Sequence, residues 1–230
     1  MRALVMVAHG TRKPGGVAMS GELADRVGAA LAQPVRVAFV DVLGPTPAEV
    51  LHGLDGEPAV VVPAFLSSGY HVREDLPAHI AASGHPRVTV TAALGPCPQM
   101  VRVLTERLWE SGWRPGDSVV LAAAGTSDRG AQRDLRVTAT LLSAALGARV
   151  ELAYAATGEP RVADAVRRLR AAGSRRVVVA SYLLAEGLFQ DRLRDSGADV
   201  VTAPLGLHPG TARLIAARFR RAVLPAPAGV

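Results

Sequence analysis

Short runs of apolar, mostly β-branched residues alternate along this chain with longer segments whose apolar residues recur every three or four positions. The short runs predict buried β-strands, and the longer segments predict amphipathic helices, as at residues 163–172. Strict alternation of the two is typical of parallel sheets with helices on both faces. We expect strands in two sets of four, at residues 3–8, 35–40, 59–63 and 87–91 and then at 118–124, 149–155, 176–181 and 198–203.

The two sets of strands are similar in sequence, which indicates one α/β unit written twice in tandem. Residues 7–11 (VAHGT) match residues 122–126 (AAAGT), with the glycine and the apolar positions kept. The turn at residues 113–117 (WRPGD) lies between the sets and is typical of a boundary. We therefore predict two repeats, 1–114 and 117–230, each a four-stranded parallel sheet flanked by helices, with a cleft between them.

Three polar residues of the first repeat have no polar counterpart in the second. Each one follows a predicted strand at its carboxyl end, where open α/β sheets bind their ligands. Two imidazoles and a carboxylate are suitable ligands for a divalent first-row metal ion, and histidine also accepts protons near neutral pH. Each residue alone is explained by a helix cap or a loop contact, but the absence of all three from the second repeat favours a metal site in the first repeat. The three are His9, Asp41 and His71, which align with Ala124, Ala156 and Phe189.

The segment 67–77 (SSGYHVREDLP) carries the other candidate binding groups around His71. Gly69 permits a tight backbone path, and Ser67 and Ser68 can donate hydrogen bonds to an anion. Arg73 can bind a carboxylate through two parallel hydrogen bonds. The acidic pair at 74–75 is explained by a favourable interaction with a helix N-terminus.

Composition narrows the classes of partner. The formal net charge is +6, almost all of the positive charge is arginine, and this favours anionic ligands. Aromatic residues make up 4% of the chain, too few for base-stacking platforms, so a small polyanion is preferred to nucleic acid. The single cysteine excludes an internal disulfide, and no apolar run approaches the roughly 18–20 residues of a membrane helix. We expect a cytosolic protein with no membrane contact.

Three motifs together resemble the class II tetrapyrrole chelatases of the CbiX and SirB type. They are the VAHGT motif at 7–11, AFVD at 38–41 and the long VPAFLSSGYHVREDLP motif at 62–77. The resemblance covers nearly the whole chain, because the long form of that family is itself a two-repeat protein with its active histidines in the N-terminal half.

The resemblance implies insertion of a divalent metal into sirohydrochlorin, with Fe²⁺ for siroheme or Co²⁺ for cobalamin. It implies that His9 and His71 hold the metal and help to take up the two pyrrole protons. Family members often carry Glu at the position of Asp41, so direct metal contact, a water-mediated contact and a proton relay all stay open for this residue. The metal would be a substrate, and no permanent cofactor is expected. The chain lacks the His-rich tail and extra cysteines of some long cobalt enzymes of the family, which favours iron.

Arginines and small polar groups around such a site would bind the carboxylates of the tetrapyrrole. The second repeat would contribute Arg129, with Arg133 and Glu186 as further candidates from their positions at strand ends. The predicted substrate-binding set is Ser67, Ser68, Gly69, Tyr70, Arg73, Arg12 and Arg129.

Two other functions stay open. The first is a non-catalytic metal or tetrapyrrole carrier with the same fold. The second is a hydrolase or phosphoryl-transfer enzyme, which we disfavour because the chain has neither a G-x-S-x-G elbow nor a G-x-x-x-x-G-K-[ST] loop.

Overall fold

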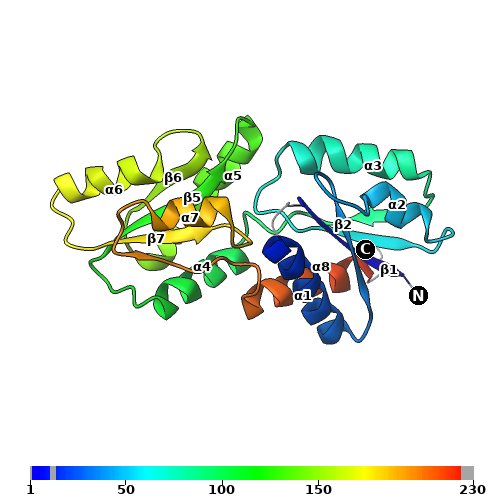
Figure 1. Cartoon of the computed structure of the whole chain (residues 1–230). Helices are drawn as coiled ribbons and strands as arrows, with labels where there is room; N and C mark the ends of the chain where they lie inside the picture. Colours follow the sequence, from blue (N-terminus) through cyan, green and yellow to red (C-terminus); the bar gives the residue numbers. More distant parts are fainter. Residues whose placement is uncertain (1, 11–13, 224–230) are drawn as a thin grey trace, which may run out of the picture. The chain divides into compact units, whose positions relative to one another are not determined.

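The computed structural model describes residues 2–10 and 14–223 and contains two four-stranded sheets, each flanked by helices (Figure 1). All strand pairs are parallel, in the orders β2-β1-β3-β4 and β6-β5-β7-β8. The predicted fold class is confirmed. The strands are β1 (Ala3–Ala8), β2 (Val35–Phe39), β3 (Ala59–Pro63), β4 (Val88–Val90), β5 (Ser118–Gly125), β6 (Val150–Thr157), β7 (Val177–Tyr182) and β8 (Val200–Val201).

Helices follow the strands in strict alternation, as the apolar periodicity predicts. One departure is a π-helical turn, η1, which runs directly into the third α-helix. The helices are α1 (Pro14–Leu31), α2 (Pro47–His52), η1 (His71–Asp75), α3 (Leu76–Ser83), α4 (Pro98–Glu110), α5 (Arg129–Leu146), α6 (Val162–Ala171), α7 (Leu188–Arg194) and α8 (Pro209–Val223).

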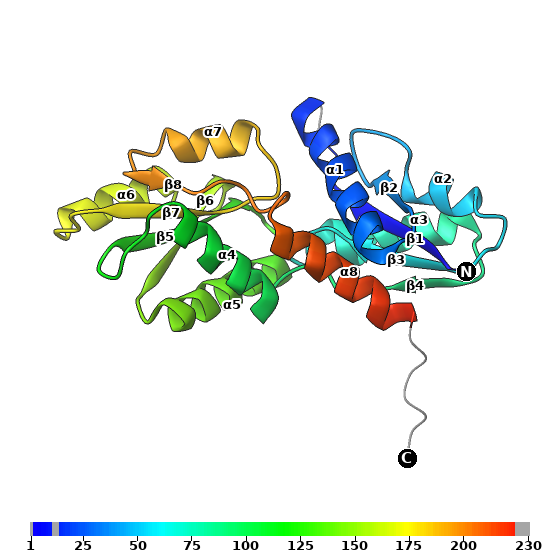
Figure 2. The same cartoon turned by 90° about the horizontal axis from the view of Figure 1, so that it is seen from below.

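In the first sheet, side chains of β1 alternate between two buried faces. Val5 and Val7 pack in a cluster with Leu51 of α2 and Leu76 at the start of α3. Helices α1 and α8 lie on the opposite face of this sheet (Figures 1 and 2). With both faces covered, the sheet holds the carboxyl ends of its strands in a fixed register.

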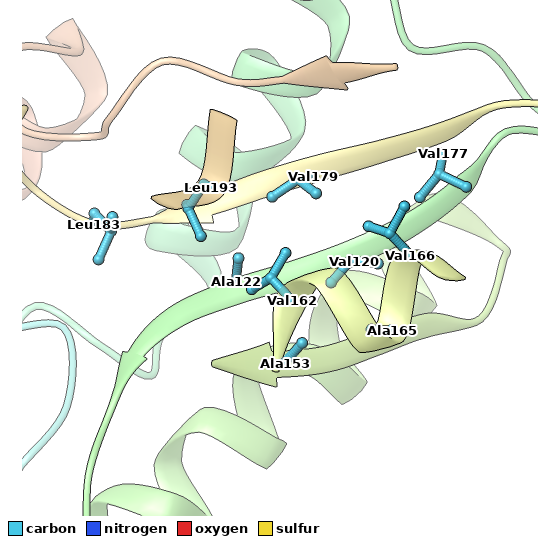
Figure 3. Packing of buried hydrophobic residues seen from close by; sticks show 10 residues of the cluster. All are labelled: Val120, Ala122, Ala153, Val162, Ala165, Val166, Val177, Val179, Leu183 and Leu193. Atoms are coloured by element: carbon cyan, nitrogen blue, oxygen red, sulfur yellow. The ribbon is translucent and has the colours of Figure 1, made fainter. Parts of the chain in front are cut away.

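The second sheet is built in the same way. Val162, Ala165 and Val166 of α6 and Leu193 of α7 pack against valines of β5 and β7 on one face (Figure 3). Helices α4 and α5 pack against each other on the other face and contact β7 and β6, respectively. These two helices and the α6–α7 pair give the second sheet the same three layers as the first.

The compact units of the structure differ from the sequence repeats by an exchange of helices. The first unit comprises Met1–Phe65, Tyr70–Leu94 and Ala212–Val230, and the second comprises Leu66–Gly69 and Gly95–Thr211. Helix α4 of the first repeat therefore belongs to the second unit, while α8 of the second repeat belongs almost entirely to the first. The predicted boundary between 114 and 117 concerns the repeat in the sequence and stays a prediction, since the compact units combine segments of both repeats.

Among residues 2–10 and 14–223, no helix is both long enough and apolar enough to cross a membrane.

Candidate functional site

The structure brings the two predicted histidines together at one edge of the first sheet. His9 directly follows β1, and His71 opens the η1 turn that follows the neighbouring strand β3. Their ring centroids lie 4.5 Å apart with an interplanar angle of 60°. His9 is exposed and the side chain of His71 is 33% exposed, so a metal ion can reach both imidazoles from solvent.

The backbone beside His9 accepts only glycine at the next position. Gly10 has φ of +98°, and a Cβ atom on it would lie 2.1 Å from the carbonyl oxygen of Asp41. The pairing of β1 and β2 continues past both strands, since the Asp41 N–H donates to the His9 carbonyl at 3.0 Å. The glycine that follows the histidine in the VAHGT motif thus allows the β2 loop to lie against the His9 backbone.

Asp41 lies next to His9 along the backbone, but its carboxylate is engaged locally. Oδ1 of Asp41 accepts a hydrogen bond from the N–H of Val42 at 2.8 Å, and the residue is exposed. In the described part of the chain, no group of three or more His, Cys, Asp or Glu residues is placed to hold a metal ion. The structure therefore assembles a pair of histidines, and a ligand role for Asp41 stays a prediction.

Asp75 is a partner of His71 that the sequence interpretation missed. Its Oδ2 lies 2.6 Å from Nδ1 of His71, and the Asp75 side chain is 27% exposed. An ionised carboxylate only accepts hydrogen bonds, so Nδ1 carries the proton and the lone pair of Nε2 is left for a metal ion. The sequence predicted a role for Asp75 at a helix N-terminus, and the structure places the residue directly before α3, with its carboxylate also on His71. Its spacing of four residues from His71 was the available indication.

Aromatic rings surround His71 on two sides. The ring of Phe65 is stacked at a centroid distance of 6.1 Å with an interplanar angle of 27°, and the ring of Tyr70 lies edge-on at 6.2 Å. Tyr70 is 59% exposed, and Arg73 on the same turn is also exposed. Tyr70 and Arg73 flank His71 in the chain, and a substrate contact by either residue stays a prediction.

The short loop Leu66–Gly69 belongs to the second unit and is anchored there by buried polar groups. The hydroxyl of Tyr182 donates to the Leu66 carbonyl at 2.9 Å, and the N–H of Ser68 donates to Oδ2 of Asp134 at 2.8 Å. Burial raises the pKa of the Tyr182 hydroxyl, which keeps it protonated as a donor. The predicted substrate-binding residues of this loop are thus held by α5 and β7.

The remaining candidates belong to the second unit or fall outside the described residues. Arg12 falls outside the described residues. Arg129 and Arg133 are exposed residues of α5, and both carboxylate oxygens of Glu186 accept hydrogen bonds from Arg194. A substrate contact by Arg129 stays a prediction.

The second repeat confirms the loss of the histidines at the equivalent positions and corrects the third pairing. Strand register aligns Ala124, near the end of β5, with His9, and it aligns Phe189 with His71. At the end of β5 the register shifts, and Gly125 pairs with Thr157. The Thr157 carbonyl lies against Gly125 as the Asp41 carbonyl lies against Gly10. The counterpart of Asp41 beside the glycine is therefore Thr157, not Ala156, and it too lacks a carboxylate.

The sequence profile of the CbiX family matches residues 3–111 and, separately, residues 118–222. The chain belongs to the CbiX family. The family predicted from the three motifs is therefore confirmed, and each repeat carries the family pattern by itself.

Individual relatives agree with this assignment. A protein of Methanothermobacter thermautotrophicus named sirohydrochlorin cobaltochelatase is 27% identical over an alignment of 128 residues, and the match covers 46% of this chain and 89% of the relative. The structure of SirB from Bacillus subtilis with Fe³⁺ superposes with a TM-score of 0.85 at 20% identity, covering 97% of this chain and 96% of the other. SirB from Bacillus subtilis subspecies spizizenii in complex with cobalt gives a TM-score of 0.78 at 20% identity, covering 96% and 95%. At this identity the two structures establish the shared CbiX-type fold over the full length.

Proposed function

We propose that this protein is a sirohydrochlorin chelatase that inserts a divalent metal ion into the tetrapyrrole, with Fe²⁺ as the favoured metal and siroheme as the product. The observation that carries the proposal is the pair formed by His9 and His71, whose ring centroids are 4.5 Å apart at the carboxyl ends of β1 and β3. The CbiX family match and the name of the Methanothermobacter relative support the substrate class.

The chemistry of metallation explains why two histidines and an open site are suitable. The metal ion must shed water and exchange protein ligands for pyrrole nitrogens, so a closed four-ligand site would hold it too firmly. Two imidazoles leave the other coordination positions open. The metal is then a substrate that leaves in the product, and the protein needs no permanent cofactor.

The same residues are suited to taking up the two pyrrole protons. As the metal passes to the tetrapyrrole, Nε2 of His71 regains its free lone pair and accepts a proton, and the Asp75 carboxylate 2.6 Å from Nδ1 stabilises the imidazolium that results. His9 takes the second proton in this proposal. Asp41 acts as a metal ligand, through a water molecule, or as a relay for these protons.

Substrate carboxylates are assigned to the polar groups predicted from the sequence. Tyr70 and Arg73 lie on the turn that carries His71, and Ser67, Ser68 and Gly69 lie in the preceding loop. Arg12 and Arg129 complete the proposed set.

A chelation assay tests the proposal directly. Metal-free sirohydrochlorin is mixed anaerobically with Fe²⁺ or Co²⁺, and the absorption change is followed with and without protein. We expect a protein-dependent rate that falls at least about a hundredfold in His9→Ala and in His71→Ala, while His52→Ala, an exposed histidine of α2, keeps the wild-type rate. Tetrapyrrole or metal binding without any protein-dependent rate would instead establish a carrier.

Cobalt is the second candidate metal, because the Methanothermobacter relative is named a cobaltochelatase. Competition between equal concentrations of Fe²⁺ and Co²⁺ in the same assay decides between them. A product that is mainly cobalt-sirohydrochlorin would overturn the preference for iron and leave the chelatase activity in place.

A further inference from the structure

The second unit contains a pocket of about 460 Å³ at the carboxyl end of β6. The pocket is lined by the end of that strand, by the first residues of α6 and by one side chain of α7. Arg161 and Arg192 are the charged residues among those that line it, and Tyr154 and Thr157 add polar groups. The pocket therefore presents positive charge in the unit that has lost the histidine pair.

This pocket occupies the position that corresponds to the metal-site edge of the first unit. Tyr154 pairs with Ala123 as Phe39 pairs with Ala8, and each of these two residues then donates its N–H to a proline carbonyl six positions later. Because the β3 and β7 registers align His71 with Phe189, Arg192 corresponds to Glu74.

The charge at this shared position has changed sign between the two units. The first unit carries Glu74 at the position that aligns with Arg192. The second unit carries Arg161 and Arg192, and no Asp or Glu lines the pocket. Arg192 thus replaces an acidic residue, whereas Arg161 aligns with Thr46 and adds a second positive charge.

The protein contacts of each arginine leave some of its hydrogen-bond donors available. Nη1 of Arg192 lies 3.4 Å from the Ala155 carbonyl, and the guanidinium lies 5.8 Å from the ring of Phe189. Arg161 contacts Glu159 through Nε alone, at 3.4 Å, and its side chain is 45% exposed. A carboxylate can bind to guanidinium groups through pairs of parallel hydrogen bonds, which gives it shorter contacts than these.

We propose that this pocket is a carboxylate-binding site formed by Arg161 and Arg192. The carboxylate belongs either to the rim of a tetrapyrrole or to a free small polycarboxylic acid, and the first source rests on the proposed function. The exposed ring of Phe189, 5.8 Å from the Arg192 guanidinium, adds an apolar surface beside the pocket that suits a carboxylate attached to a large ring.

Equilibrium binding in the absence of metal tests the site without depending on catalysis. Metal-free sirohydrochlorin, followed by its absorption, and citrate, followed by calorimetry, are titrated into the full-length protein and its variants. We expect Arg161→Gln/Arg192→Gln to weaken binding about tenfold, since each of these solvent-exposed arginines contributes a few-fold. Arg167→Gln, a surface arginine of α6 that does not line the pocket, is the matched control and should bind as the wild type does.

A second variant gives an effect of opposite sign. Glu159→Gln removes the carboxylate that competes for Arg161, so we expect binding to strengthen by about twofold or more. If circular dichroism showed that the double arginine variant does not fold, Glu159→Gln would still test the site, because the Glu159 side chain is 74% exposed.

The outcomes distinguish the two sources of the carboxylate, and they distinguish this site from the proposed chelatase function. Weaker binding of sirohydrochlorin in the double variant assigns the carboxylate to the tetrapyrrole, and weaker binding of citrate alone assigns it to a free acid. Binding of both ligands at wild-type strength in the double variant, or an equal loss in Arg167→Gln, overturns the site. Arginine-dependent binding by a protein that inserts no metal would refute the chelatase proposal and leave this site standing.

Discussion

Replacement of Asp75 tests whether the carboxylate prepares His71 for metal binding. Its Oδ2 lies 2.6 Å from Nδ1 of His71 and favours the tautomer in which Nε2 has the lone pair. Removing such a partner typically costs 10–100-fold in metal affinity or activity. Because the two side chains are 27% and 33% exposed, solvent screens part of the charge interaction, and we expect the lower end of that range. Asp75→Asn should therefore raise the metal concentration for half-maximal chelation about tenfold, which corresponds to about 1.4 kcal/mol.

The rate of chelation measured against Fe²⁺ or Co²⁺ concentration gives this value. Asp75→Ala, which also removes the hydrogen bond, should have a larger effect than Asp75→Asn, which keeps an acceptor oxygen. Glu74→Gln is the control, since it removes one negative charge from the neighbouring position of the same turn. If Asp75→Ala stayed within twofold of the wild type while His71→Ala abolished chelation, the carboxylate would have no part in preparing the histidine.

Three further changes test other parts of the structure. Gly10→Ala should reduce both the rate of chelation and the urea midpoint of unfolding, because the φ of +98° disfavours a side chain and the new Cβ would clash with the Asp41 carbonyl. A wild-type midpoint would contradict this. Tyr182→Phe should lower the free energy of unfolding by about 1–3 kcal/mol, measured by urea denaturation, since it leaves the Leu66 carbonyl without its donor. Burial lowers the pKa of His208 in the folded protein. At a pH near the ordinary value of about 6.5, the unfolded chain therefore binds more protons than the folded chain, and the free energy of unfolding falls as the pH decreases through that value. His208→Gln should flatten this fall between about pH 7 and 5, and an unchanged slope would show that His208 does not cause it.

Much of the fold follows from the apolar pattern, because buried parallel strands are short, nearly continuous apolar runs. Strands β1 and β3 have the bounds that the pattern predicts, whereas the edge strand β8 is confined to Val200–Val201 where six residues were expected. A run of apolar residues does not reveal how many of them find a partner at the edge of a sheet. The exchange of α4 and α8 was also beyond the pattern, since periodicity shows which side of a helix is apolar but not which sheet that side covers.

The site was predictable to the extent that the two repeats could be compared. The replacement of His9 by Ala124 and of His71 by Phe189 marked the histidine pair without any structure. Asp75 escaped because an acid four residues after a histidine is also what the start of a helix favours, and only the η1 turn shows which role its carboxylate has. The conformation of Asp41 escaped because its bond to the next N–H depends on the loop backbone rather than on residue type.

The exchange of α4 and α8 also explains why the second repeat persists after losing its histidines. A deletion of that repeat would remove α8, whose Ile215 and Phe219 are almost fully buried, and would leave α4 without β7 and α5. The first copy would then expose two apolar surfaces to water. Selection for a folded first copy therefore retains the second copy as well, and its strand ends are left free to diverge.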